Sequence, residues 1–400
     1  MSLFQFELRK LFLNRKNIII LLFMFVIYGA IGFGTTYFLV GSKANYQIYA
    51  ELADPLAGPL NPRKAEEARI VYEGLKERYG GSEEAIYYGT SSDPAAKFDV
   101  DYAHFANHVD EYYNGSPMDS LGEPYGINVL GRKLSSLEQA EESDSFEHRK
   151  TKNQLAIEQN LGEPQFANTV LWDNLFKNWG DFIMLFLLFV PLVFIIAPVF
   201  SIEASTGMDS LILSSRHGRR KIVSAKIVAV IVSAVCIIAA YLAATFAFGF
   251  LSVGTFEGGE AALRSIPGYV RAPFGFTNWH FTIVSVLWLL VSGVVYALAA
   301  AFISSRTGNL LAAFGISLIV LFLNVGLSAL GTTISRMIQP IIDFGMASIT
   351  LTGEVFVDYK VYNIFGTVVP YWFMIIVFMA AVTTLAGFGM YWGQKRRTAV

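Results

Sequence analysis

The chain has 400 residues, of which 54% are hydrophobic and 16% charged, whereas a soluble chain carries about a quarter charged residues. Its net charge is −2, which argues against nucleic-acid binding through neutralised phosphates. The single cysteine, Cys236, excludes an intrachain disulfide and a cysteine-based metal cluster. The apolar residues gather in long uncharged blocks, which predicts an all-α polytopic membrane protein, because lipid offers the backbone no hydrogen-bond partner.

The chain begins with a basic, amphipathic leader, residues 1–16. We predict an interfacial helix there, with Glu7, Arg9 and Lys10 pointing away from a shared apolar face. The uncharged block that follows predicts a first transmembrane helix over 17–40. This block exceeds the 7–15 apolar residues of a signal peptide, so we expect it to be retained.

Residues 41–180 have the composition of a soluble domain, with 23 acidic and 13 basic side chains. The acidic balance either attracts cationic peptides or metal ions or simply keeps the domain soluble, and we favour solubility. The helix signals are a start at Asn61-Pro62 with an end at Gly80-Gly81, an apolar stripe over Phe98–Tyr113, and a charge-rich stretch over Ser135–Gln159. We predict a mostly helical extracytoplasmic domain.

Two histidines of that domain form the only weak metal candidate. His104 and His108 are spaced i and i+4, with Asp101 and Glu111 nearby, a pattern that could hold a divalent metal such as zinc. Phe105 stands where a zinc protease would need its catalytic glutamate. Such short spacings arise by chance, so we interpret the strip as a solvated helix edge and predict no metal site.

The loop between the second and third predicted spans, residues 203–226, reads EASTGMDSLILSSRHGRRKIVSAK. It resembles the corresponding loop in permease subunits of the ABC type-2 exporter family. In that family an acidic residue ends the second span, a glycine and two leucines follow on a short coupling helix, and a basic cluster leads to a lysine that opens the third span. The matching positions are Glu203, Gly207, Leu211, Leu213, Arg216, Arg219 and Lys226.

The resemblance covers the whole chain in outline, and the large domain after the first span matches a longer-looped subset of the family. It implies a bacterial, multi-pass cell-membrane protein that pairs with a second permease subunit, identical or homologous. It also implies separate ATPase subunits on the cytoplasmic face, with ATP and magnesium bound there. The sequence has no G-x-x-x-x-G-K-[ST] loop, so we expect no cofactor and no enzymatic activity in this chain.

The residues of the loop support the same interpretation independently. Its apolar tip, Leu211 to Leu213, suits insertion into a groove of a partner protein. The basic cluster suits the anionic inner leaflet. The simpler alternative is that this cluster only sets membrane topology, but positive-inside placement explains neither the apolar tip nor Gly207.

Five further spans are expected within residues 181–400, near 182–202, 227–254, 281–303, 310–330 and 369–392. Pro191 and Pro198 are expected to bend the second span. The leader, the 203–226 loop, Arg306 and the tail carry thirteen basic and three acidic residues. The positive-inside rule therefore places both termini in the cytoplasm, which agrees with six spans.

The predicted spans contain no Asp, Glu, Lys or Arg, which argues against a proton-coupled carrier. The outer segment 332–368 is interrupted by Pro340, so we predict an interfacial or re-entrant segment there. Mild polar residues inside the spans are our candidates for a translocation route: Tyr241, Thr245, Ser292, Tyr296, Asn324 and Ser328.

These observations favour the transmembrane subunit of an ATP-driven exporter. An uncharged lining suits a hydrophobic or amphiphilic cargo such as a lipid, an antimicrobial peptide or a drug. The alternatives are an ABC-type sodium extruder, a membrane-anchored sensor that binds a ligand through residues 41–180, and a membrane-anchored metalloenzyme built on His104 and His108.

Overall fold

The computed structural model describes residues 3–40, 43–60, 62–79, 93–114, 126–180, 182–208, 221–328 and 337–396. Within them, five helices are long and apolar enough to cross a bilayer, and the bent pair α1–α2 can supply a sixth span. The chain is therefore a predominantly helical, multi-pass membrane protein, as predicted. The bundle consists of α2 (Arg15–Val40), α10 (Phe182–Ile196) continued by α11 (Pro198–Ser205), α13 (Lys221–Val253), α14 (Asn278–Arg306), α15 (Leu310–Ser328) and α20 (Tyr371–Arg396).

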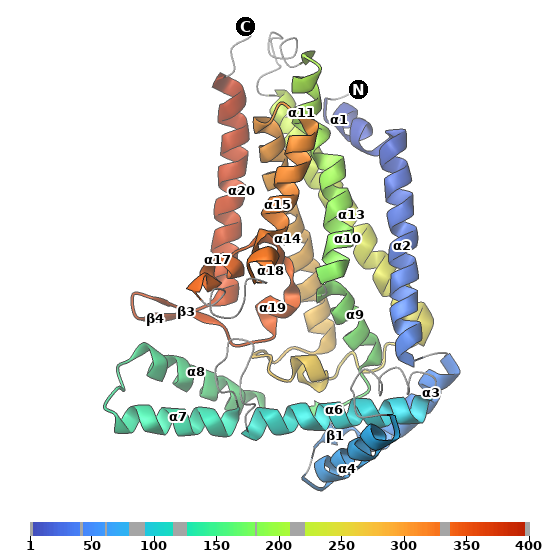
Figure 1. Ribbon diagram of the computed structural model, residues 1–400, viewed down its shortest axis with the longest axis vertical. Helices are drawn as coiled ribbons and strands as arrows, with labels where there is room; N and C mark the ends of the chain where they lie inside the picture. Colours follow the sequence, from blue (N-terminus) through green and yellow to red (C-terminus); the bar gives the residue numbers. More distant parts are fainter. Residues whose placement is uncertain are drawn as a thin grey trace.

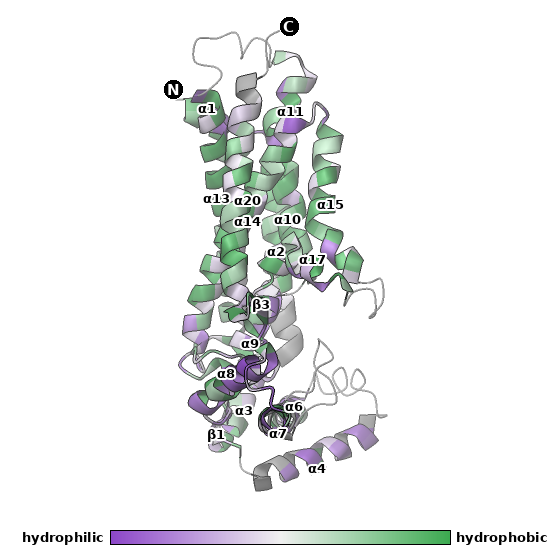
Figure 2. Ribbon diagram, turned by 90° about the vertical axis from the view of Figure 1, so that its left-hand side faces the viewer, coloured by the Kyte–Doolittle hydropathy of each residue, from purple (hydrophilic) through white to green (hydrophobic). Residues whose placement is uncertain are grey.

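Hydropathy separates the molecule into two parts. The bundle helices are coloured as hydrophobic along their length, whereas the helices at the far end carry many hydrophilic residues (Figure 2). Both ends of the chain lie at the same end of the bundle, opposite those polar helices (Figure 1). An even number of crossings produces this arrangement.

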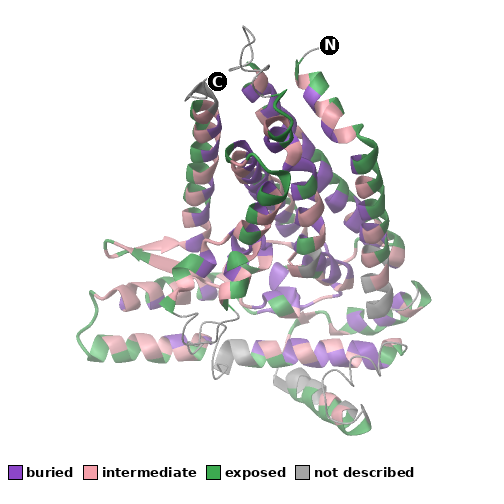
Figure 3. Ribbon diagram, turned by 45° about the horizontal axis from the view of Figure 1, so that its top comes forward, coloured by how far each residue is buried: buried purple, intermediate pink, exposed green. Residues whose placement is uncertain are grey.

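Buried residues gather on the inward sides of the bundle helices (Figure 3), and α14, which contacts several of these helices, carries many of them. Its small residues allow close approach of its neighbours. A Cβ atom on Gly293 would lie 2.2 Å from Cδ1 of Ile238 in α13, and one on Gly389 in α20 would lie 2.6 Å from Cε2 of Phe302. These glycines therefore pack helices of the same chain against one another.

Helix α1 (Leu3–Phe12) meets α2 at an angle of 59° and packs against α13. An interfacial leader was predicted, but its orientation differs from the prediction. Glu7 is buried and Lys10 is half-buried, whereas Leu3 and Phe6 are exposed. The side of α1 that packs against the bundle therefore carries Glu7 together with the apolar Leu11 and Phe4, while Arg9 is exposed.

The polar domain, residues 43–169, is mostly helical as predicted. Its apolar stripe, Phe98 to Val109, packs against Tyr49 and Phe166 in a second core, which also includes Val270 from outside the domain. The predicted start at Pro62 and the predicted end before Gly80 agree with the observed helix. The elements are α3 (Lys43–Ala53), η1 (Asp54–Leu56), β1 (Gly58–Pro59), α4 (Pro62–Tyr79), α6 (Pro94–Asn114), α7 (Ile127–Gln139), α8 (Phe146–Leu161) and β2 (Gln165–Phe166), with β1 and β2 antiparallel.

The expected single helix over 135–159 is instead the helical hairpin α7–α8. Glu141 adopts a left-handed conformation with φ of 58°, which a continuing helix does not allow. Ser145 then starts α8 as an N-cap, because its hydroxyl accepts a hydrogen bond of 3.1 Å from the backbone N–H of His148. A serine that can cap a helix, placed inside this charge-rich stretch, was the sequence signal for a boundary between two helices.

Helix α9 (Val170–Gly180) was assigned to the outer domain by sequence, but its side chains belong to the core of the bundle. Trp172, Phe176 and Trp179 are almost completely buried there. The Trp179 indole N–H donates to the Thr245 hydroxyl of α13 at 2.9 Å. By packing, the bundle therefore begins about ten residues before the predicted boundary at 180.

The outer segment folds into three short helices and a hairpin, and its residues 332–336 lie outside the described part. All five residues of α18 are buried, and the indole of Trp288 in α14 donates to the Ile349 carbonyl at 2.8 Å. The segment thus packs against α14 and α15. The hairpin was missed, although β-branched residues around a Phe-Gly turn were its signal. The elements are α17 (Gln339–Asp343), α18 (Met346–Thr350), α19 (Thr352–Phe356), β3 (Val361–Ile364) and β4 (Thr367–Pro370).

Candidate functional site: a buried charge cluster beside a helix break

The two charged residues that flank the 203–226 loop form an ion pair. Oε2 of Glu203, near the end of α11, lies 2.6 Å from Nζ of Lys226 in the first turns of α13. The Lys226 side chain is 1% exposed and the Glu203 side chain 12%. Lys226 also donates to the carbonyl of Val199, and its ammonium lies 4.9 Å from the centre of the Phe200 ring. The pair therefore fixes the two ends of the loop to each other.

Helix α1 contributes a second pair of charges. Nζ of Lys10 lies 2.9 Å from Oε1 of Glu203, so both carboxylate oxygens are occupied. Glu7 is buried and close enough to interact electrostatically with Lys226. We call these four residues, Glu7, Lys10, Glu203 and Lys226, the charge cluster. Two acids and two bases balance, as a buried group of charges requires.

This cluster corrects the expectation that the spans hold no buried ionisable residue. The predicted spans stopped at residue 202 and restarted at 227, just short of Glu203 and Lys226. The helices continue past these limits, and the side chains point inward because each charge finds its counterion on another helix. Sequence reasoning singled out both residues, but it placed Glu7 and Lys10 away from the apolar face of the leader and did not connect them with this pair.

The cluster adjoins a break in the second span, between Ile196 of α10 and Pro198 of α11. Pro198 has no N–H to continue the helical ladder. The Ser304 hydroxyl of α14 enters the ladder, donating to the Ala197 carbonyl at 2.6 Å and accepting from the N–H groups of Phe200 and Ser201 at 3.2 and 3.1 Å. We call this region the helix break. Side chains of α13 and α14 thus supplement the backbone hydrogen bonds here, because Pro198 offers no N–H, while the Ala197 N–H still donates to the Val193 carbonyl at 2.7 Å.

Pro198 lies at the one-residue gap between α10 and α11, whereas Pro191 lies inside α10 without ending it. The bend expected at these two prolines stays a prediction. Only part of the helix break could be predicted from the sequence, namely the position of Pro198. Ser304, which inserts its hydroxyl, had no distinguishing signal, because serine is common in spans and its partner is about a hundred residues away.

Gly207 ends α11. Its φ of 71° is the left-handed conformation that glycine adopts beyond a helix C-terminus, and its N–H donates to the Ala204 carbonyl at 3.3 Å. The proposed coupling residues Leu211, Leu213, Arg216 and Arg219 lie outside the described residues. The described structure thus fixes both ends of the loop, residue 208 and residue 221.

The six route candidates are distributed over separate helix contacts. The Tyr241 hydroxyl donates to the Asn178 carbonyl of α9 at 2.9 Å, and Thr245 pairs with Trp179. The Tyr296 hydroxyl donates to the Ser317 carbonyl of α15 at 2.9 Å. These side chains are buried and hold helices together.

The other three candidates are similar. Ser292 is buried and bonds to the Leu289 carbonyl of its own helix at 3.4 Å, and the Asn324 amide lies 2.8 Å from the Ser348 hydroxyl of α18. Ser328 is exposed and bonds to Val325 at 2.8 Å. The six residues therefore do not converge on one cavity in this conformation, and their hydrogen bonds are contacts between or within helices.

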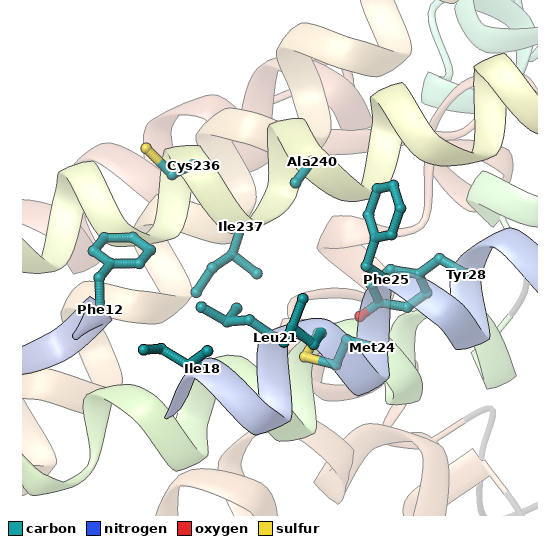
Figure 4. Close-up of a pocket in the computed structure, with 10 residues that line it drawn as sticks. Phe12, Ile18, Leu21, Met24, Phe25, Tyr28, Cys236, Ile237 and Ala240 are labelled. Atoms are coloured by element: carbon teal, nitrogen blue, oxygen red, sulfur yellow. The ribbon is translucent and has the colours of Figure 1, made fainter. Parts of the chain in front are cut away.

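An apolar recess of about 330 Å³ lies between α2 and α13 (Figure 4). Leu21, Met24 and Phe25 form one side, and Ile237 with Ala240 the other. Tyr28 closes it toward α10, because its hydroxyl donates to the Leu187 carbonyl at 2.8 Å. A second hollow of about 650 Å³ lies between α14 and α20, with Thr383 and Thr384 in its lining. Both suit hydrocarbon rather than a hydrated solute.

The polar side chains around His104 in α6 form hydrogen bonds and ion pairs within the polar domain. Asp101 pairs with Lys97 and accepts from the Tyr49 hydroxyl at 3.2 Å, while Nε2 of His104 lies 3.2 Å from the Tyr72 hydroxyl. Over the residues that the structure describes, no three His, Cys, Asp or Glu side chains gather as a metal site would require. His108 does not join His104 in such a group.

The polar domain is joined to the bundle by buried polar contacts that the sequence did not indicate. Nη2 of Arg264 lies 3.1 Å from Oε2 of Glu158 in α8, and these side chains are 5% and 1% exposed. Arg264 also donates to the Val270 and Gly162 carbonyls, at 2.8 and 3.2 Å. We call this the Arg264 junction, and it ties α8 to the segment between α13 and α14.

Glu257 forms a second junction, beside α3. It accepts from the Tyr46 hydroxyl at 3.0 Å, and its backbone carbonyl accepts from the Trp172 indole at 2.8 Å. Partial burial and the neighbouring Asp54 carboxyl raise the pKa of Glu257 above its ordinary 4.5, although the Tyr46 hydrogen bond opposes the shift. The folded protein therefore retains this proton more firmly than the unfolded chain does.

The sign of the resulting pH dependence follows from linkage. Between pH 4.5 and the raised pKa, the folded state binds more protons than the unfolded state, so stability falls as the pH rises. We expect Glu257→Gln, which keeps the shape of the neutral acid, to flatten this part of the curve. The measurement is the thermal unfolding midpoint from pH 4 to pH 7 in wild type and variant. Parallel curves would contradict the assignment.

No family model, curated protein or solved structure matches the chain. The functional interpretation therefore depends on the charge cluster, the helix break and the resemblance of the 203–226 loop.

Proposed function

We propose that the chain is the transmembrane subunit of an ATP-driven exporter of the ABC type-2 kind. Separate ATPase subunits would dock on the loop between α11 and α13, and a second permease subunit, identical or homologous, would complete the transporter. The observation that carries the proposal is the Glu203–Lys226 pair, 2.6 Å long, which fixes both ends of that loop to the bundle directly beside the helix break. A force on the loop would therefore reach α1, α11 and α13 together.

The helix break supplies a hinge for this motion. Ser304 and Lys226 supply part of its hydrogen bonds where Pro198 offers no N–H, so α11 can change its angle to α10 by exchanging these side-chain contacts. Helix α10 lies against α14, and α18 dips between α14 and α15 at the other end. ATP-driven movement of the loop would thus be passed along α10 toward the short helices that close the bundle opposite the termini.

The orientation in this proposal is cytoplasmic for the end that holds both termini and outward for the polar domain. The charge distribution supports it, because basic residues gather near the loop and the termini. The cell membrane of a bacterium is the expected location, since the resemblance implies it.

A hydrophobic or amphiphilic cargo, such as a lipid, an antimicrobial peptide or an apolar drug, fits the chain best. The recesses beside α2 and between α14 and α20 are lined mainly by hydrocarbon side chains. Sodium extrusion is less well supported, because the buried carboxylate of Glu203 has both oxygens bound by lysines.

The test is the double substitution Leu211→Asp with Leu213→Asp. Two carboxylates in an apolar groove would remain unpaired, so we expect retention of the ATPase during purification from native membranes to fall about tenfold or more. ATP-dependent extrusion of a hydrophobic dye should fall with it, while the amount of chain in the membrane stays the same.

The matched control is Leu211→Met with Leu213→Met, which preserves an apolar tip and should retain both ATPase and extrusion. Wild-type extrusion in the aspartate variant would contradict the docking role.

A further inference from the structure

A pocket of about 280 Å³ opens beside the helix break. The turn between α1 and α2 forms one wall, α10 and α11 the floor, and the first residues of α15 the other wall. We call it the amphipathic pocket. Its lining is Glu7, Lys10, Leu11, Asn14, Lys16, Asn17, Phe194, Ile195, Ala197, Pro198, Val199, Ile202, Leu310, Leu311 and Phe314.

The two walls differ in chemistry. Phe194, Leu311 and Phe314 present hydrocarbon, and Leu311 is 78% exposed. The opposite wall is polar and carries Asn14 and the exposed Lys16. An occupant that satisfies both walls has an apolar body and a polar head.

The charge of the polar wall determines which kind of polar head group fits the pocket. Lys10 is bound to Glu203, and Glu7 is buried beside Lys226, so these charges are compensated within the charge cluster. The Lys16 ammonium makes no hydrogen bond or ion pair with any other residue that the structure describes, and Arg15 beside it is also exposed. The pocket mouth therefore has one uncompensated positive charge, which favours an anionic head.

The position of the pocket indicates that such an amphiphile comes from the membrane. It lies where the basic leader gives way to the apolar span α2, and a boundary of this kind is expected at the headgroup level of a leaflet. Basic pockets between spans at this level bind anionic lipid headgroups. A small soluble anion would leave the apolar wall in water, and a zwitterionic lipid would bring a second positive group toward Lys16.

We propose that the amphipathic pocket binds one anionic phospholipid, with its headgroup at Lys16 and Asn14 and an acyl chain along Phe194, Leu311 and Phe314. This inference requires only that the chain lies in a membrane, and it does not depend on an ATPase partner. The lipid would bridge α2 and α15 across the helix break and so connect the break to the lipid composition of that leaflet.

The experiment uses the full chain reconstituted in phosphatidylcholine vesicles, with Phe314→Trp as a fluorescent reporter. Brominated phosphatidylglycerol and brominated phosphatidylcholine are compared as quenchers, and the signal of the parent chain is subtracted. We expect the added tryptophan to show an apparent preference of about fivefold for phosphatidylglycerol, the effect of one basic residue at a membrane surface.

A matched pair of variants separates a site from general attraction. Lys16→Gln should abolish the preference, whereas Arg15→Gln, which removes the same charge from a neighbour outside the lining, should keep most of it. Equal quenching by both lipids, or equal effects of the two variants, would overturn the proposal. Loss of the preference on adding inorganic phosphate would also overturn it, because that result indicates a soluble-anion site.

Native mass spectrometry of the chain without the reporter gives a second measurement. One phosphatidylglycerol should remain bound to the wild type and to the Arg15→Gln variant, but not to the Lys16→Gln variant. Retention by all three proteins would contradict the assignment, and this measurement stands even if Phe314→Trp fails to fold.

Discussion

Replacing Glu203 with alanine is expected to lower the free energy of unfolding by about 3 kcal/mol, because the change leaves a buried ammonium without its main counterion. Lys226 is 1% exposed and would keep only the Val199 carbonyl, the Phe200 ring and the nearby Glu7. The thermal unfolding midpoint of the purified protein, recorded in one detergent at a fixed scan rate, measures the loss.

Two variants test the cause. Glu203→Gln combined with Lys226→Met removes both charges while keeping most of the volume, so it should recover stability to within about 1 kcal/mol of the wild type. Lys10→Ala should have a small effect, because this lysine is 35% exposed and water can replace it. A double variant no more stable than Glu203→Ala would show that the charge pair is not the source of the loss.

Arg264→Met is the second substitution with a large expected effect. It would leave the carboxylate of Glu158, which is 1% exposed, without its cation and would strip donors from the Gly162 and Val270 carbonyls. We expect a loss of about 3–5 kcal/mol. The polar domain should also loosen from the bundle, because this junction joins α8 to the segment between α13 and α14.

Limited proteolysis measures the loosening. Cleavage near Gly162 should become faster in the Arg264→Met variant, and the thermal midpoint should fall. Lys133→Ala is the matched control, because its ion pair with Glu147 joins α7 and α8 at the surface, where both side chains are about a third or more exposed. Equal protection of Arg264→Met and wild type would mean that the domain is held by its other contacts.

The spans were predictable from sequence because a bilayer constrains length and hydropathy strongly. The predicted limits of the third span, 227–254, and the observed helix Lys221–Val253 agree at one end and differ by six residues at the other. The difference has a cause: the span was predicted to begin directly after Lys226, whereas Glu203 on another helix allows this lysine to be buried within the helix. Local sequence does not reveal a counterion that lies 23 positions away.

Of the candidate site, only the residues at the two ends of the 203–226 loop could be predicted from the sequence. Glu203, Gly207 and Lys226 were singled out from the loop, and the structure brings the two charged residues into contact. Ser304 and Arg264 were missed because each acts on a backbone carbonyl of a distant segment, at Ala197 and at Gly162 respectively. The route candidates were chosen for polarity alone, and Tyr241 shows why this fails, since a buried hydroxyl also serves to join two helices.

The docking of a separate ATPase on the 203–226 loop is the central claim, and site-specific crosslinking tests it most directly. A photoreactive amino acid at position 211 in the full chain, irradiated in native membranes, should form an adduct with a protein that contains a P-loop ATPase sequence. The same amino acid at position 365, in the turn between β3 and β4 at the other end of the molecule, should not. An adduct of equal yield from both positions, or no ATPase adduct from position 211, would contradict the account.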